Sequence, residues 1–198
     1  CQARDHEHVH VEKMSFETAE KAVMIALQSP EHYLNFEFQG GEPLLNYPVI
    51  RHIVEYAEKN KQAHSIQYSV VTNLTLLSDE MLDFFEQYDV RISTSLDGNL
   101  ELHNANRSDR LGVGSFENVV AAIKKIQARN LPIGAIQTTT RQSLSKSKQI
   151  IDTYRELCFQ SVFIRPLTKL GTAIPNWSEI GYSASEFVQF YRECLSYI

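Results

Sequence analysis

The sequence predicts an α/β fold built on parallel strands, and three observations lead to that prediction. Apolar strand-like runs alternate with amphipathic helix-like segments along the chain. Five strands separated by helices require right-handed βαβ crossovers, which give an α/β barrel or an open doubly wound sheet. Polar and glycine residues follow each strand directly, where function gathers in parallel α/β barrels. Because every strand delivers such residues to one rim, we favour the barrel.

The individual elements are predicted from helix-capping residues, from the spacing of apolar residues, and from prolines that end helices. The first is a helix that Ser15 caps and that runs through Ala19, Val23 and Leu27 to about Ser29, before Pro30. Strands are predicted at 33–38, 66–71, 90–94, 132–138 and 161–165. The amphipathic helices that succeed them are predicted at about 48–60, 78–87, 115–130, 145–158 and 183–197. No repeat, low-complexity tract or linker interrupts this alternation, so we expect one domain over 1–198.

Composition narrows the class of protein. The chain has 198 residues, 43% of them hydrophobic and 22% charged, as in ordinary globular proteins. A formal net charge of -5 without a basic cluster argues against a nucleic-acid or anionic-membrane surface. The apolar stretches are too short to cross a bilayer. The three cysteines have no close spacing, so we expect a reducing, cytoplasmic setting with Cys158 and Cys194 as small buried side chains.

The loop after the first predicted strand reads Gln39-Gly40-Gly41-Glu42-Pro43. Two glycines lack a Cβ and so allow a ligand to approach the backbone closely. Glu42 would supply a fixed carboxylate for a cationic group such as an ammonium. The residues alone favour a plain tight turn with an exposed glutamate, because paired glycines are common in loops.

Three segments together resemble radical S-adenosylmethionine enzymes. The string 36–45, Phe-Glu-Phe-Gln-Gly-Gly-Glu-Pro-Leu-Leu, resembles the family's GGEP segment. Thr72-Asn73-Leu74-Thr75 resembles its TNGT turn, with Leu74 in place of the usual glycine. Ser95-Leu96-Asp97-Gly98, followed by His103 and Arg107, resembles its SLDG...H...R segment. The resemblance implies that the protein binds S-adenosylmethionine at the carboxyl ends of its strands.

The resemblance also assigns roles to residues of this chain. Gly40, Gly41 and Glu42 would bind the methionyl amino group, and Ser95 with Arg107 would hold the carboxylate or the ribose. Backbone around Ile164 and Arg165 would border the adenine. The complete set implied to bind the cofactor is Gly40, Gly41, Glu42, Pro43, Thr72, Asn73, Ser95, Asp97, Arg107, Thr138 and Arg165.

For three of these positions, a purely structural role remains an alternative to cofactor binding. Asp97 before Gly98 would also suit an Asx-type turn, and His103 would also suit a residue that only satisfies a hydrogen bond. Arg107 would also suit an ion pair with Asp109.

The family's cluster motif, C-x-x-x-C-x-x-C, bears on the start of the chain. Three thiolates of this motif hold three irons of a 4Fe-4S cluster. Cys1 resembles the last cysteine of the motif, which implies that the family's first barrel strand lies upstream of it. We therefore expect a partial parallel (β/α)6-type barrel, truncated at its N-terminal strand, that does not assemble the cluster alone. His6, His8 and His10 alternate as in a zinc or nickel site, but the acidic residues between them favour a solvated loop.

A narrower resemblance is to SPASM-type peptide maturases such as the anaerobic sulfatase maturases, and within these to the radical maturase of the His-Xaa-Ser system. The strings 14–20, 51–56, 138–140 and 163–167 carry it. It implies reductive cleavage of S-adenosylmethionine to modify a ribosomally made peptide, with His-Xaa-Ser repeats as substrate and a partner maturase. The auxiliary-cluster domain of such enzymes is not part of this sequence.

Two other functions remain open on the residues alone. A hydrolase or lyase on a similar barrel would use Glu42, Asp97 and His103 as acid-base groups. A non-catalytic domain would bind a peptide or partner instead. The sequence does not reveal which bond would be formed on the peptide or which residue would be modified.

Overall fold

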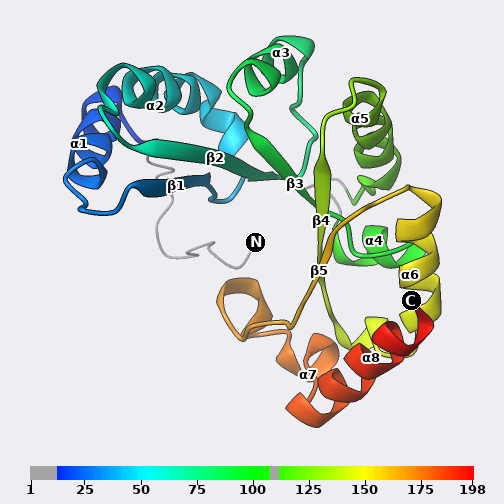
Figure 1. Cartoon of the computed structure of the whole chain (residues 1–198). Helices are drawn as coiled ribbons and strands as arrows, with labels where there is room; N and C mark the ends of the chain where they lie inside the picture. The colour runs from blue at the N-terminus through cyan, green and yellow to red at the C-terminus, as the bar shows by residue number, and fades with distance from the viewer. Residues whose placement is uncertain (1–12, 108–111) are drawn as a thin grey trace. The chain divides into compact units, whose positions relative to one another are not determined.

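The computed structural model describes residues 13–107 and 112–198 (Figure 1). Strands and helices alternate along the chain, and the sheet holds the strands in the order β1-β2-β3-β4-β5. The chain divides into two compact units. One contains the described residues up to Thr72 together with Leu76–Ile92, and the other contains Asn73–Thr75 and the described residues from Ser93 onward.

The first unit follows the predicted alternation closely. Its elements are α1 (Phe16–Ala26), β1 (Tyr33–Phe38), the short 3-10 helix η1 (Pro43–Asn46), α2 (Tyr47–Asn60), β2 (Ser65–Thr72) and α3 (Asp79–Gln87). The predicted cap of α1 is confirmed, because the Thr18 amide donates to Ser15 Oγ at 3.1 Å. The helix ends at Ala26, earlier than the predicted end near Ser29.

The core of this unit lies between the two strands and their helices. β1 and β2 pair in parallel, from Tyr33 opposite Ser65 to Phe38 opposite Val70. Along β2 the buried side chains are those of Tyr68, Val70 and Thr72, as the period of two in a strand requires. α1 and α2 lie side by side against the strands (Figure 1). This burial leaves the opposite face of β1 and β2 with mostly polar side chains.

The second unit holds the rest of the sheet. β3 (Arg91–Ser95) runs into it, followed by α4 (Leu100–Asn106), α5 (Phe116–Ala128), β4 (Ile133–Thr138), η2 (Arg141–Ser143), α6 (Ser147–Glu156), β5 (Val162–Arg165), η3 (Gly171–Ala173), α7 (Trp177–Ile180) and α8 (Ala184–Tyr197). β4 and β5 are parallel, with Thr138 opposite Arg165. The strands and longer helices match the predicted ranges within a few residues, whereas α4, α7 and the 3-10 helices were not predicted.

Helices α6 and α8 pack against each other in this unit (Figure 1). Ile150 and Tyr154 of α6 and Phe190 and Cys194 of α8 are buried, which confirms the expectation for Cys194. The expectation for Cys158 was wrong: the residue is exposed. It follows the end of α6 with a φ of 55°, a left-handed conformation that turns its side chain out of the helix face.

Candidate functional site

The loop after β1 offers open backbone at its two glycines. An added Cβ at either Gly40 or Gly41 would meet no atom within 4 Å. Both glycines line a pocket of about 540 Å³ within the first unit, together with residues of α1 and α2. A ligand therefore has access to the main chain of this loop without displacing side chains.

The carboxylate of Glu42 is held in place by its neighbours. Its Oε1 accepts hydrogen bonds from the Leu44 amide at 3.0 Å and from the Thr72 hydroxyl at 2.6 Å. Thr72 is 1% exposed at the end of β2, whereas Glu42 is half-buried at the N-cap of η1. The structure thus brings two predicted site residues, 30 positions apart, into direct contact. This geometry differs from the plain turn with an exposed glutamate that the residues alone allowed.

The turn after β2 accommodates the leucine that replaces the expected glycine. Leu74 has a φ of 61°, the left-handed conformation in which glycine is ordinarily favoured, and is 2% exposed. Asn73 Oδ1 accepts from the amide and the hydroxyl of Thr75, at 3.0 and 2.7 Å. These bonds form an Asx-type turn, so the backbone keeps the glycine-like shape while the leucine side chain is buried.

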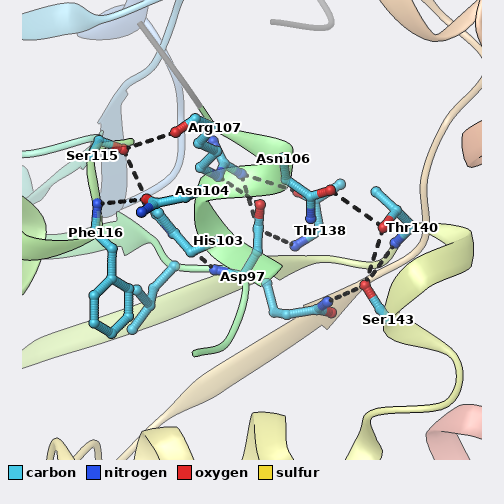
Figure 2. Close-up of polar contacts among 12 residues, drawn as sticks. Asp97, His103, Asn104, Asn106, Arg107, Ser115, Phe116, Thr138, Thr140 and Ser143 are labelled. Carbon is cyan, nitrogen blue, oxygen red and sulfur yellow. Dashed lines mark hydrogen bonds and ion pairs between the residues drawn. The ribbon is translucent and has the colours of Figure 1, made fainter. Parts of the chain in front are cut away.

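The carboxylate of Asp97 is the centre of a polar cluster in the second unit (Figure 2). Arg107 Nε donates to Oδ2 at 2.8 Å and Arg107 Nη2 donates to Oδ1 at 3.2 Å. The backbone amide of Thr138 donates to Oδ1 at 2.9 Å. Asp97 is 1% exposed, so these partners replace water around a buried charge. The ion-pair partner of Arg107 is therefore Asp97; the alternative partner Asp109 lies outside the described residues.

Gly98, next in the chain, has a φ of 132°. A Cβ there would come within 3.0 Å of Ile150 and 3.1 Å of Leu102, so both the conformation and the packing require glycine. The following residue, Asn99, begins α4 by accepting the Leu102 amide at its Oδ1. This local geometry places His103 and Arg107 back over Asp97.

His103 is fully buried beside Asp97 (Figure 2). Its Nδ1 lies 3.4 Å from the Asp97 amide, and its Nε2 lies 2.9 Å from Ser115 Oγ. Burial lowers the pKa of His103 to about 4, and the charge of Arg107 adds to that lowering while Asp97 opposes it. Both ring nitrogens are engaged and the ring is neutral near pH 7. This arrangement argues against the acid-base role that a hydrolase or lyase would give to His103.

The remaining predicted site residues stand at or near strand ends. Ser95 ends β3, Thr138 ends β4 and Arg165 ends β5. Thr138 and Arg165 are brought together, since they are opposite each other in the parallel register and the Thr139 amide donates to the Arg165 carbonyl at 2.9 Å. Arg107 Nη2 also reaches Thr138 Oγ1, at 3.5 Å. Pro43, in the first unit, opens η1 directly after Glu42.

Several polar residues of this cluster were not among the predicted cofactor-binding residues. Gln137, Thr139, Thr140 and Ser143 are buried and joined by hydrogen bonds, and Thr140 Oγ1 lies 3.4 Å from Asn106 Oδ1. The only signal in the sequence was the run of threonines after β4. In addition, Tyr154 Oη donates to the Leu96 carbonyl at 2.5 Å, so the loop after β3 is fixed from the α6 side.

Metal ligands are not found in the part of the chain that the structure describes. It contains no group of three or more His, Cys, Asp or Glu side chains placed to hold a metal ion. Burial raises the pKa of the Cys194 thiol to about 11, which suits a packing role. Cys1, the predicted cluster ligand, and His6, His8 and His10 lie outside the described residues. Within residues 13–107 and 112–198, no helix has the length and apolar character needed to span a membrane.

A family model and several known proteins match this chain. A family model described as the radical SAM superfamily matches residues 1–155. An uncharacterized protein of Methanocaldococcus jannaschii is 29% identical over 138 residues, which cover 70% of this chain and 48% of that protein. A cysteine-type anaerobic sulfatase-maturating enzyme of Clostridium novyi is 32% identical over 113 residues, covering 56% of this chain and 30% of the enzyme. The chain thus spans about half, or less, of the length of these relatives.

Solved structures show the same fold. A structure described as native anSMEcpe with bound AdoMet superposes with a TM-score of 0.87 at 22% identity, covering 100% of this chain and 55% of that one. A second, with bound AdoMet and the Kp18Cys peptide, gives a TM-score of 0.84 and covers 100% of this chain and 56% of that one. This likeness confirms the predicted fold class, an α/β partial parallel barrel.

Proposed function

Because the chain belongs to the radical SAM superfamily, we propose that residues 1–198 form the core domain of an enzyme that cleaves S-adenosylmethionine reductively and modifies a ribosomally made peptide. When bound together with a reduced 4Fe-4S cluster, S-adenosylmethionine would supply the radical chemistry that removes hydrogen from the substrate. Cys1 is the proposed ligand to that cluster within this sequence. The chain's own residues bind and orient the cofactor.

The observation that carries this proposal is the preorganised loop after β1. Glu42 presents a carboxylate whose position is fixed by the Leu44 amide and the Thr72 hydroxyl. The neighbouring Gly40 and Gly41 leave the backbone open. A fixed carboxylate beside accessible main chain suits the methionyl ammonium group, because a charge-assisted hydrogen bond is strongest when its acceptor needs no reorganisation. Pro43, which starts η1, limits the freedom of the same loop.

Further cofactor contacts are assigned from the family resemblance. We assign Ser95 to the carboxylate or ribose of the cofactor, and the backbone near Arg165 to the adenine. Asn73 stands in the turn after β2 and Thr138 is the last residue of β4, positions that suit polar contacts. Asp97 and Arg107 belong to the proposed site too, and the ion pair between them orients both side chains.

A peptide is the substrate class that the relatives support best. Among them are a cysteine-type and a serine-type sulfatase-maturating enzyme and a radical SAM cyclopropyl synthase. We propose a peptide with His-Xaa-Ser repeats as substrate, a partner maturase, and a cytoplasmic setting without nucleic-acid or membrane partners. The net charge of -5 is consistent with the last point.

Mass spectrometry of candidate peptides tests this function. The full-length enzyme that carries this sequence would be loaded with its cluster anaerobically and incubated with S-adenosylmethionine, reductant and a His-Xaa-Ser repeat peptide. A mass change that requires all components supports the proposal. A control peptide with the repeat histidines and serines replaced by alanine should stay unmodified. Cofactor cleavage that leaves every peptide unchanged would contradict the assigned substrate.

A further inference from the structure

Four hydrogen bonds around His103 close into a ring (Figure 2). The Asp97 amide donates to His103 Nδ1, and His103 Nε2 contacts Ser115 Oγ. Ser115 Oγ donates to the Arg107 carbonyl at 3.4 Å, and Arg107 Nε donates to the Asp97 carboxylate at 2.8 Å. Asp97 therefore takes part in the ring at two points: its backbone amide donates to His103, and its carboxylate accepts from Arg107.

The chemistry of the members fixes the direction of every bond. A backbone amide only donates, so His103 Nδ1 must carry the lone pair. The hydroxyl of Ser115 donates to the Arg107 carbonyl, so it accepts from His103, whose proton then sits on Nε2. A proton on Nδ1 would set two donors against each other at a site that is fully buried. The ring is complete only for the neutral Nε2-H tautomer.

Asp97 connects this ring to two strand ends. It stands two positions after Ser95, the last residue of β3. Its Oδ1 accepts the amide of Thr138, the last residue of β4. A shift of Asp97 therefore moves the ends of both strands, whereas His103 itself is buried and turned toward protein groups.

The Ser115 side chain takes part in the ring and does not cap its own helix. It stands at the N-cap of α5, yet its side chain makes no capping bond to the helix. The hydroxyl serves His103 and Arg107, and the Phe116 amide is satisfied by Asn104 Oδ1 at 3.0 Å instead. An N-cap serine ordinarily stabilises its helix through its hydroxyl, so the diverted hydroxyl of Ser115 indicates that His103 is a fixed structural partner.

We propose that His103 is a positioning residue for cofactor binding: by accepting the Asp97 amide as its Nε2-H tautomer, it holds Ser95 and Thr138 where they bind S-adenosylmethionine. The inference rests on the proposed function for its ligand. The geometry of the ring itself is independent of that ligand.

Two substitutions of His103 test the contacts of Nδ1 and Nε2 separately. An asparagine amide reaches about as far as Nδ1, so His103→Asn retains an acceptor for the Asp97 amide. A glutamine amide reaches about as far as Nε2, so His103→Gln retains the partner of Ser115 and leaves the Asp97 amide without an acceptor. A purely structural histidine would make the two variants similar. The proposal predicts instead that only His103→Gln loses cofactor affinity.

Calorimetric titration of S-adenosylmethionine into the cluster-loaded, full-length enzyme is the decisive test. We expect the affinity of His103→Asn to lie within about threefold of wild type and that of His103→Gln to be about tenfold weaker. The two variants should have thermal stabilities comparable with each other, since each retains one of the two imidazole contacts. His64→Gln is the control. Its imidazole also bonds through both nitrogens, to the Glu31 and Leu27 carbonyls, but lies just before the amino end of β2, and its loss should leave affinity unchanged.

An NMR measurement tests the tautomer of His103 in the absence of the cofactor. Long-range proton-nitrogen spectra of the imidazole at neutral pH should show the proton of His103 on Nε2. Protonation on Nδ1, or equal affinities of the Asn and Gln variants, would overturn the inference. Failure of the wild-type enzyme to bind S-adenosylmethionine would instead contradict the proposed function, and the predicted tautomer would then stand as a structural result alone.

Discussion

The stability of the Asp97-Arg107 pair can be predicted by comparison with a surface pair of the same length. The Arg107 Nε to Asp97 Oδ2 distance is 2.8 Å, and the Lys21 Nζ to Glu17 Oε1 distance is 2.7 Å. The Asp97 side chain is 1% exposed and that of Arg107 30%, whereas Lys21 and Glu17 are 71% and 78% exposed. Burial, and not distance, therefore distinguishes the two pairs.

Asp97→Asn should lower the free energy of unfolding by about 2 to 4 kcal/mol, because an amide replaces a buried carboxylate that accepts from Arg107 twice. The amide oxygen can still accept from Thr138, which limits the loss. Glu17→Gln, the same chemical change in the exposed pair, should cost less than about 1 kcal/mol. Both values come from urea unfolding of the chain at neutral pH, followed by circular dichroism.

A similar loss in both variants would refute the reasoning, since it would mean that the buried carboxylate gains nothing from its extra partners. A change in the urea dependence of the free energy of unfolding in only one variant would show that the unfolded state of that variant had changed. A double-mutant cycle that combines Asp97→Asn with Arg107→Met would then isolate the interaction energy between the two side chains.

Three further predictions follow from the same contacts. His103 has a pKa of about 4 in the folded chain against 6.5 as its ordinary value, so the unfolded chain binds the proton first as pH falls. Stability should therefore decrease from pH 7 toward pH 4, by up to about 3 kcal/mol from this residue, and His103→Asn should flatten the decrease measured by urea unfolding. Gly114→Ala would place a Cβ against the Asn104 side chain that caps the Phe116 amide, and should lower the free energy of unfolding by about 1 to 3 kcal/mol in thermal or urea melts; an unchanged melting temperature would contradict that contact. Glu42→Gln should keep the fold, because an amide oxygen can still accept from Leu44 and Thr72, yet weaken S-adenosylmethionine binding to the cluster-loaded enzyme about 10- to 100-fold in calorimetry.

Local patterns were sufficient to predict most of the secondary structure. β1 spans Tyr33–Phe38 as predicted, because Pro30 marks the start of this strand-like run and the two glycines after Gln39 mark its end. Helices α3 and α8 begin after Ser78 and Ser183, whose hydroxyls accept from the third residue that follows. Helix α4 was missed because seven residues are too few to show a helical period. Its cap, Asn99, was the one available signal.

The sequence nominated residues for the candidate site but did not predict the contacts among them. The resemblance of three segments led us to predict Glu42, Thr72 and Asp97 as site residues. The Glu42-Thr72 bond joins residues 30 positions apart, and the Thr138 amide reaches Asp97 from 41 positions away. Such contacts depend on how parallel strands place their ends, which no local pattern records.

Leu74 shows a different limit of sequence reasoning. Its replacement of a glycine weakened the resemblance of the turn after β2. In the structure the residue takes the left-handed conformation with a φ of 61° and buries its side chain. Strain of this kind is tolerated where packing offsets it, and such an offset is visible only in the folded chain.

Production of 5'-deoxyadenosine is the direct test of whether the enzyme cleaves S-adenosylmethionine reductively. The full-length enzyme that carries this sequence, with its cluster reconstituted anaerobically and verified by iron content, would be incubated with S-adenosylmethionine and a strong reductant, and the products would be separated by liquid chromatography and mass spectrometry. We expect 5'-deoxyadenosine and methionine, with much less of both from Glu42→Gln at limiting cofactor. An intact cluster that yields no 5'-deoxyadenosine under these conditions would contradict the proposed activity.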